Sequence, residues 1–215
     1  MDYPKHDQYA KIYARYLAPG RTEQMLDLCG PLTGKTMLDL CGGGGRASRA
    51  ALSRGASSVM LVDESYPMAG AVQEKDLTVW VGDLKSVLKA PLLKEGFDVA
   101  FCQQAINYWF SAALIKQVHR QLKPGAVFVF NTFNEAPPSF PVPKSYEYDG
   151  RKYMELSWLS APNTVEHVQI CDGERVHTTQ FQWITPERYR QVLSPYFEVE
   201  EIRAGKTSIY RCTAL

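Results

Sequence analysis

The feature that most constrains this chain is a run of glycines between an apolar strand and a helix. Residues 37–46 read Met-Leu-Asp-Leu-Cys-Gly-Gly-Gly-Gly-Arg. Glycines at such a turn allow positive φ and let a ligand approach the backbone closely. The helix that follows offers unpaired N–H groups and a positive dipole end. The turn therefore predicts a ligand site, with Asp39 suited to an ammonium group and the helix start suited to a carboxylate.

Composition places the chain among ordinary globular proteins. Its 215 residues are enough for one domain with a sizeable core. With 24 basic and 23 acidic residues, and no basic run, the sequence predicts no nucleic-acid partner. It holds no apolar stretch of membrane-spanning length, and its five scattered cysteines fit reduced thiols better than disulfides or zinc. We expect a cytoplasmic protein without a metal, either a monomer or a homodimer.

Short apolar strands alternate with helices between residues 36 and 132. This alternation predicts right-handed βαβ units and a parallel sheet. Ligands bind such sheets at the carboxyl ends of the strands, near the point where the strand order reverses. The strands expected at 36–41, 59–63, 77–81, 97–102 and 126–132 place four polar residues at those ends, Asp39, Asp63, Asp83 and Gln103.

The pattern changes after residue 134. Residues 146–184 read as antiparallel strands with hairpin turns at Asp149-Gly150 and Asp172-Gly173. A helix should follow from Pro186, with Thr185 as its N-cap, and then two final strands. We expect one domain with a helical cover at 1–35, a cofactor-binding core at 36–134, an antiparallel lid at 135–185, and a helix and strand pair at 186–215.

These motifs together resemble the class I S-adenosylmethionine-dependent methyltransferases that act on small molecules. The match runs from about residue 36 to 132 and fits the pattern D-x-x-x-G-x-G through Asp39, Gly43 and Gly45. Cys41 stands where many members have glycine. The resemblance implies an α/β fold, a Rossmann-like, doubly wound, seven-stranded sheet with its last strand antiparallel. It further implies an antiparallel β insert after strand five.

The resemblance also implies a set of cofactor contacts. Asp63 would bind the ribose hydroxyls, Asp83 would lie near the adenine amino group, and the Leu84 N–H would face a ring nitrogen. The methionine end would lie over residues 43–45, with its methyl group pointing toward residues 103–109. Arg46 is either a contact to the cofactor carboxylate or a solvated helix residue. The implied cofactor-binding set is Tyr9, Asp39, Gly43, Gly45, Arg46, Asp63, Asp83, Leu84 and Gln103.

Two residues are candidates for catalysis. A two-residue turn at 172–173 pairs Val168 with His177, which places His177 on an apolar face and turns His167 the other way. On that face His177 is either a satisfied core residue or a general base in a closed pocket. Tyr13, from an N-terminal helix that also carries Tyr9, is either a packing residue or a contact to the cofactor or acceptor.

The predicted function is transfer of a methyl group from S-adenosylmethionine to an N or O nucleophile, or a carbon, leaving S-adenosylhomocysteine. The antiparallel insert resembles those of methyltransferases acting on sugars, amines and other secondary metabolites. Aromatic residues in or near it predict a small, partly aromatic or apolar acceptor: Phe133, Phe140, Tyr146, Trp158, Phe181 and Trp183. Residues 107–109 lie where that acceptor would approach.

Two alternatives remain. An NAD-dependent oxidoreductase has a similar topology, although Ser48 stands where the dinucleotide fingerprint needs a third glycine. A non-catalytic regulatory protein could retain the same cofactor pocket. Calorimetry with NAD and S-adenosylmethionine separates the first alternative, and assays of methyl transfer separate the second.

Overall fold

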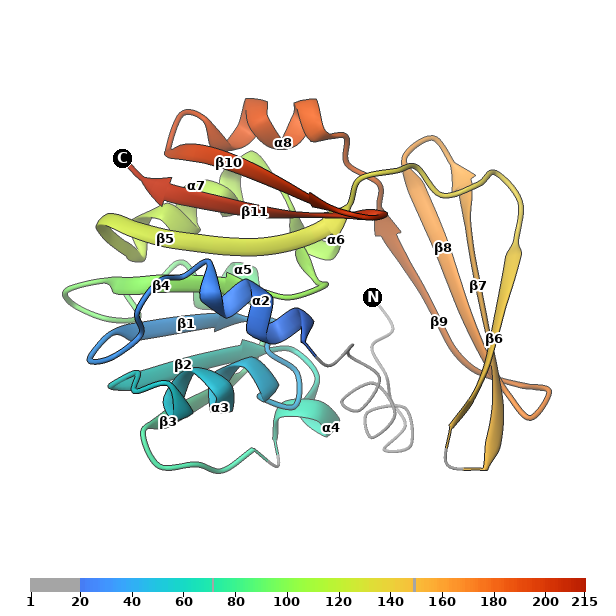
Figure 1. The fold of residues 1–215 in the computed structure, drawn as a ribbon, viewed down its shortest axis with the longest axis horizontal. Helices are drawn as coiled ribbons and strands as arrows, with labels where there is room; N and C mark the ends of the chain where they lie inside the picture. The colour runs from blue at the N-terminus through green and yellow to red at the C-terminus, as the bar shows by residue number, and fades with distance from the viewer. Residues whose placement is uncertain (1–19, 71, 149) are drawn as a thin grey trace.

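The computed structural model describes residues 20–70, 72–148 and 150–215, which form two β-sheets (Figure 1). The larger sheet has seven strands in the order β10-β11-β5-β4-β1-β2-β3. This confirms the predicted Rossmann-like, seven-stranded fold with an antiparallel insert after the fifth strand. The strands of the larger sheet are β1 (Thr36–Leu40), β2 (Ser58–Asp63), β3 (Leu77–Val81), β4 (Phe97–Cys102), β5 (Leu122–Phe133), β10 (Phe197–Ala204) and β11 (Thr207–Ala214).

The strand directions follow the expected pattern. β1 lies between β2 and β4 and is parallel to both, and the next pairs outward, β2 with β3 and β4 with β5, are also parallel. β11 runs antiparallel to both of its neighbours, β5 and β10. The chain leaves β1 toward β2 on one side and later enters β4 on the other. The carboxyl end of β1 is therefore the topological switch point at which such sheets bind ligands.

Helices cover both faces of this sheet because successive strand residues point to opposite sides. Met37 and Leu38 are neighbours on β1 and are both fully buried, but they belong to separate hydrophobic clusters. Met37 packs in the cluster that includes residues of α2 (Arg21–Asp27) and α3 (Arg46–Ser53). Leu38 packs in the cluster formed with four other helices, α5 (Leu84–Val87), α6 (Ile106–Trp109), α7 (Ala112–Arg120) and α8 (Pro186–Leu193), while the short helix α4 (Tyr66–Ala69) contributes to neither cluster.

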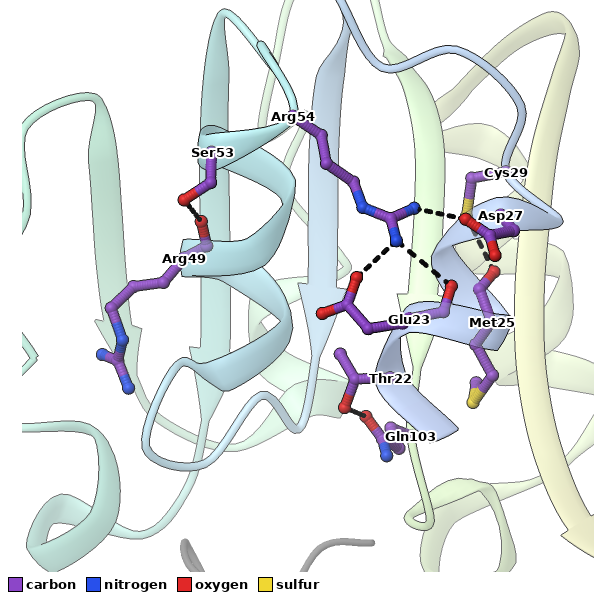
Figure 2. A network of polar contacts seen from close by, with 9 residues as sticks. All are labelled: Thr22, Glu23, Met25, Asp27, Cys29, Arg49, Ser53, Arg54 and Gln103. Atoms are coloured by element: carbon purple, nitrogen blue, oxygen red, sulfur yellow. Dashed lines mark hydrogen bonds and ion pairs between the residues drawn. The ribbon is translucent and has the colours of Figure 1, made fainter. Parts of the chain in front are cut away.

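Polar contacts hold α2 against the sheet and against α3 (Figure 2). Arg54, at the end of α3, pairs with Glu23 and with Asp27, the latter through Nη1 and Oδ1 at 2.8 Å. The Thr22 hydroxyl donates to the Gln103 amide oxygen at 2.9 Å. The helix predicted at residues 22–29 therefore forms, and it contacts the residue that follows β4.

The second sheet consists of four consecutive antiparallel strands beside the carboxyl ends of the parallel strands (Figure 1). The Asp172-Gly173 turn forms as predicted, with φ values of 50° and 87°. β6 begins at Val142, before the predicted start of the antiparallel strands at residue 146, and it tolerates Pro143 because it is an edge strand. The strands are β6 (Val142–Tyr148), β7 (Arg151–Ala161), β8 (Thr164–Cys171) and β9 (Glu174–Gln182).

The predicted pairing of Val168 with His177 is wrong. The register shifts between Gln169 and Ile170, so that Gln169 lies opposite His177 and Val176 is an extra residue in β9. Such a β-bulge moves every later residue of its strand to the other face. His177 therefore shares a face with His167 and Gln169 rather than with Val168.

Candidate active site

A cavity of about 290 Å³ lies at the carboxyl ends of β1, β2 and β3. It occupies the switch point at which an open α/β sheet binds its ligand. Three of the residues predicted to contact a cofactor line it, Asp63, Asp83 and Leu84. The lining also includes Cys41, Glu64, Lys85, Tyr108 and Trp109.

The glycine turn beside this cavity has an alternating backbone. Residues 41, 43 and 45 take positive φ, with values of 56°, 52° and 73°. Gly43 and Gly45 adopt this conformation without strain, whereas Cys41 carries a Cβ in a region that costs about 1 kcal/mol or more. Burial raises the pKa of the Cys41 thiol well above its usual range, which disfavours the reactive thiolate form.

Asp39 is almost completely buried beneath this turn, with 1% of its surface exposed. Its Oδ2 accepts a hydrogen bond from the Ser48 hydroxyl at 2.6 Å. Burial, with a smaller contribution from the charge of Asp63, raises the pKa of Asp39 to about 6. Ser48, which replaces the third glycine of a dinucleotide fingerprint, is therefore the direct partner of the acid. Asp39 is not among the described residues that line the cavity, and its contact with an ammonium stays a prediction.

Asp63 connects the end of β2 to the glycine turn. Its Oδ2 accepts from the Gly43 N–H and its Oδ1 from the Ser65 N–H, both at 2.8 Å. Burial raises the pKa of this carboxyl above its ordinary value. Each carboxylate oxygen keeps a further lone pair that can accept from a ribose hydroxyl. The structure thus places Asp63 where the predicted contact requires it, at the wall of the cavity.

Asp83 has a structural role as well as a place in the cavity wall. It is the N-cap of α5, and its Oδ2 accepts from the N–H and the hydroxyl of Ser86 at 3.1 and 2.9 Å. These hydrogen bonds hold the pKa of its exposed carboxyl below the usual value. Leu84 opens α5, and an N–H in the first turn of a helix has no intrahelical partner. That N–H is therefore available to a ligand.

The other predicted cofactor contacts are placed less directly. Gly43 donates to Asp63, Gly45 is the N-cap of α3, and Arg46 is its first residue. None of these three is among the described residues lining the cavity. Gln103 is held by Thr22, while its buried Nε2 has no hydrogen-bond partner among the described residues. Tyr9 and Tyr13 lie outside the described residues.

A second cavity, of about 340 Å³, lies between the two sheets. The core contributes Gln104, Asn107, Tyr108, Asn131, Thr132, Phe133 and Thr207 to its lining. The four-stranded sheet contributes Lys144, Glu155, Ser157, His167, Gln169 and Phe181. Tyr108 is a lining residue of both cavities, so the two cavities adjoin at this side chain.

Comparison with known proteins places this arrangement in a family. Residues 38–130 match the model of a methyltransferase domain. The ubiquinone biosynthesis O-methyltransferase of Pseudomonas paraeruginosa (strain DSM 24068 / PA7) is 30% identical over 113 residues, which cover 51% of this chain and 49% of that protein. The chain thus spans about half the length of this relative. Together with the glycine turn and the acid-lined cavity described above, these matches support a class I S-adenosylmethionine-dependent methyltransferase.

Solved methyltransferase structures share the fold over nearly the whole chain. DesVI of Streptomyces venezuelae is 15% identical with a TM-score of 0.76, covering 96% of this chain and 98% of that one. The sugar N-methyltransferase KedS8 from Streptoalloteichus sp. ATCC 53650 is 16% identical with a TM-score of 0.75, covering 100% and 94%. At these identities the likeness shows the fold, including the four-stranded sheet.

S-adenosylmethionine is the cofactor of this methyltransferase family, and the residues present fit it. The 290 Å³ cavity combines carboxylates at the ends of two strands with a helix-start N–H. The orphaned Nε2 of Gln103 is a buried donor of the kind that a ligand satisfies. Asp63, Asp83 and Leu84 would hold the nucleoside, and the turn at residues 43–45 admits close backbone approach.

Hydrogen bonds between side chain and backbone join the two sheets around the second cavity. Asn107 of α6 donates from Nδ2 to the Gln182 carbonyl at 2.8 Å and accepts from the Thr132 hydroxyl at 2.9 Å. Gln104 takes positive φ and donates its N–H to Asn131 at 2.8 Å. These contacts fix the end of β9 against α6 and β5. The relative position of the two walls of the second cavity therefore depends on hydrogen bonds between residues far apart in the sequence.

The four-stranded sheet presents ionisable side chains to this cavity. Ser157 Oγ and His167 Nδ1 are 2.8 Å apart, and burial lowers the pKa of His167. Glu155 accepts at Oε1 from Tyr146 at 3.2 Å and from Gln169 at 3.3 Å, and burial raises the pKa of its carboxyl. His177 is not among the described lining residues, and its role as a base stays a prediction.

Some aromatic residues expected around an acceptor lie here and others do not. Phe133 and Phe181 line the cavity with stacked rings, 5.9 Å between centroids. Phe140 is 63% exposed, and Trp183 lines a different cavity beside α8. Sequence reasoning missed the polar lining from β6, β7 and β8, because the docking of the second sheet against the core decides which of its two faces lines the cavity.

Neither a cluster of metal ligands nor a membrane-spanning helix is found among the described residues. No group of three or more His, Cys, Asp and Glu side chains in these ranges is arranged to hold a metal ion. No helix within residues 20–70, 72–148 and 150–215 is long and apolar enough to cross a membrane.

Proposed function

We propose that this methyltransferase transfers the methyl group of S-adenosylmethionine to an N or O nucleophile of a small molecule bound between the two sheets. We call the 290 Å³ cavity at the carboxyl ends of β1, β2 and β3 the cofactor cavity. The observation that carries this proposal is the position of Tyr108, which lines both the cofactor cavity and the second cavity. A methyl donor in one cavity and an acceptor in the other would meet at this residue. We therefore call the second cavity the acceptor cavity.

The reaction is an in-line displacement at the sulfonium methyl. The lone pair of the nucleophile forms a bond to the methyl carbon, the carbon–sulfur electrons return to sulfur, and the nucleophile loses its proton. Because sulfonium is already a good leaving group, the protein's main task is alignment and exclusion of water. Orientation of two bound reactants can lower a barrier by about 7–11 kcal/mol. The four-stranded sheet, our proposed lid at residues 135–185, supplies one wall of the enclosure.

The lining indicates an acceptor with both a flat face and several polar groups. Tyr108, Phe133 and Phe181 form an aromatic wall, with Tyr108 and Phe181 centroids 5.5 Å apart. Glu155, Gln169 and Asn131 offer hydrogen-bonding groups around it. An amino sugar suits this lining best, because hydroxyls and an amine can use the polar groups while the ring lies on the aromatic wall. This agrees with the sugar N-methyltransferase named among the structural neighbours.

A phenol is the second candidate acceptor. The stacked rings of Phe133 and Phe181 would suit a planar aromatic compound. A relative of similar sequence is the ubiquinone biosynthesis O-methyltransferase described above, which supports a phenol as acceptor. We keep both classes as the acceptors to be tested first.

We assign the cofactor roles as follows. Asp63 binds the ribose hydroxyls, while Asp83 and the Leu84 N–H bind adenine. The glycine turn, with Asp39, Arg46 and Gln103, receives the methionine end. Tyr9 and Tyr13, which lie outside the described residues, stay predicted contacts to the cofactor or the acceptor. The geometry around Asp63, Asp83 and Leu84 supports this assignment most directly, since all three line the cavity.

The deciding experiment measures binding and transfer separately. Titration calorimetry should detect S-adenosylmethionine and S-adenosylhomocysteine binding and no NAD binding. Mass spectrometry should then detect a gain of one methylene unit on D-glucosamine, other amino sugars or catechol. Binding of NAD alone would favour the oxidoreductase alternative. Tight S-adenosylmethionine binding without transfer to any acceptor would favour the regulatory alternative.

A further inference from the structure

One face of the four-stranded sheet carries two rows of polar side chains toward the acceptor cavity. Strand pairing places Glu155 opposite Gln169, and Gln169 opposite His177. In the adjacent row Ser157 lies opposite His167, and His167 opposite Thr179. A sheet face against a protein core is usually apolar. The polar rows therefore indicate a surface built to contact a polar ligand.

The Ser157 row lies nearer to the point where the two cavities meet. Tyr108, which lines both cavities, packs against Phe181 of β9 with 5.5 Å between ring centroids, and Phe181 lies two residues after Thr179 on the same strand. Thr179 is directly opposite His167, whereas His177 belongs to the next row along the strands, farther from Phe181 and Tyr108. Among these two histidines, His167 alone is a lining residue of the described cavity.

The hydrogen bond to Ser157 leaves one nitrogen of His167 for chemistry. Nδ1 is 2.8 Å from the Ser157 hydroxyl oxygen. When the Nδ1–H donates to this oxygen, Nε2 carries the free lone pair of the neutral ring. No hydrogen bond from Nε2 to another described residue is present. The arrangement is that of a base whose ring is oriented by a neighbouring hydroxyl.

We propose that His167, oriented by Ser157, is the general base that removes the proton from the acceptor's amine or hydroxyl. As the nucleophile's lone pair forms the bond to the methyl carbon, its proton passes to Nε2 of His167 and later to solvent. This proposal rests on the proposed methyl transfer and adds a catalytic residue to it. General bases of this kind contribute roughly 10²–10⁴-fold to rate.

The surroundings of His167 keep it in the required protonation state. Burial lowers its pKa, so the ring is neutral near neutral pH. Four other ionisable groups face this region: Glu155 on β7, Lys144 on β6, His177 on β9 and Tyr108 on α6. Burial raises the pKa of both Glu155 and Tyr108, which limits the negative charge near the imidazole.

The test compares His167→Gln with a matched substitution, His119→Gln, on the far helix α7. Transfer is measured with D-glucosamine or catechol, whichever the unmodified protein methylates. His167→Gln should lower kcat about 100-fold while KM and affinity for S-adenosylhomocysteine stay unchanged. In the unmodified protein, protonation of His167 should lower kcat as the pH falls. This fall should be absent in His167→Gln. His119→Gln should leave both unchanged.

Ser157 provides a second, graded readout. Ser157→Ala should lower kcat less than His167→Gln and displace the acid limb of the pH profile, because the imidazole loses its orienting partner. Ser157→Thr, which keeps a hydroxyl, should restore both. A purely structural role for Ser157 would change stability without moving the pH profile.

Nitrogen NMR of the histidine rings in the S-adenosylhomocysteine complex tests the proposal without any acceptor. We expect a neutral His167 with its proton on Nδ1 near pH 7. A protonated ring, or a proton on Nε2, overturns the proposal. Wild-type kcat and pH dependence in His167→Gln would overturn it too, as would loss of the acid limb in His177→Gln alone. If the unmodified protein methylates nothing, the proposed function itself fails, which is a distinct result.

Discussion

The two cavities of this methyltransferase are built in different ways. The cofactor cavity is formed by residues that follow strands of one sheet, and the two aspartates that line it accept from groups at most 20 residues away in the sequence, Ser86 for Asp83 and Gly43 for Asp63. The acceptor cavity takes its walls from both sheets, with partners as distant as Asn107 and Gln182. A donor site made by one motif can stay the same while a docked sheet changes the acceptor.

If this contrast is correct, changes at the glycine turn should act on cofactor binding and stability, and changes on the four-stranded sheet should act on the acceptor alone. Four substitutions test it, beginning with the largest expected effect.

The buried charge of Asp39 should give the largest effect, as a pH dependence of stability. Its folded pKa of about 6 lies above the ordinary aspartate pKa of 3.8, so between these values the folded state binds more protons than the unfolded state. The contribution of the protonated Asp39 side chain to the free energy of unfolding is therefore full below pH 3.8 and is lost as pH rises through about 6. The difference corresponds to about 3 kcal/mol. Denaturant unfolding of the cofactor-free protein and of Asp39→Asn, from pH 4 to 7, should show this slope only with Asp39.

Asp63→Ala should reduce affinity for S-adenosylhomocysteine by roughly 100-fold, since hydrogen bonds to a charged group contribute about 1.5–3 kcal/mol. It also removes the acceptor of the Gly43 N–H and so loosens the turn. Calorimetry measures the affinity, and circular dichroism checks that the fold remains. Asp76→Ala, which replaces an exposed acid directly before β3, is the control. Unchanged affinity in Asp63→Ala would remove the ribose assignment.

Gly42→Ala should destabilise the protein by about 2 kcal/mol, because inserting atoms into a packed site is costly. An added Cβ would lie 2.7 Å from the Asp39 carboxylate oxygen and from a Leu61 carbon. Gly125→Ala is the comparison, since its added Cβ meets open space and only its φ of 75° is unfavourable. Thermal unfolding of both variants gives the values. Equal losses would show that packing against Asp39 is unimportant.

Glu155→Gln should have the smallest effect, about tenfold on the KM for an amino sugar, equivalent to 1.4 kcal/mol. Glu155 lines the acceptor cavity and does not line the cofactor cavity, so S-adenosylhomocysteine affinity should not change. Glu174→Gln, at the exposed turn between β8 and β9, is the matched control. A loss of cofactor affinity in Glu155→Gln would contradict the separation of the two sites.

The sequence allowed much of the fold to be predicted because its signals are local. Apolar runs located β1 to β4, and Thr185 with Pro186 located the start of α8, where the Thr185 hydroxyl accepts from Arg188. The short helices α5 and α6 were missed because single turns have too few residues to show a period. The bulge at Val176 was missed because an extra residue leaves no mark in a two-residue alternation.

The same distinction holds for the sites. The sequence by itself determined the donor site, because Asp39, the glycine turn, Asp63 and Asp83 are each attached to a strand end, and parallel strands bring those ends together. Only the tertiary structure decided the acceptor cavity. The bulge at Val176 placed both histidines on one face, of which His167 lines the cavity, and the docking of the second sheet through Asn107 brought that face to Tyr108. Register and docking depend on contacts between distant residues, which no local pattern specifies.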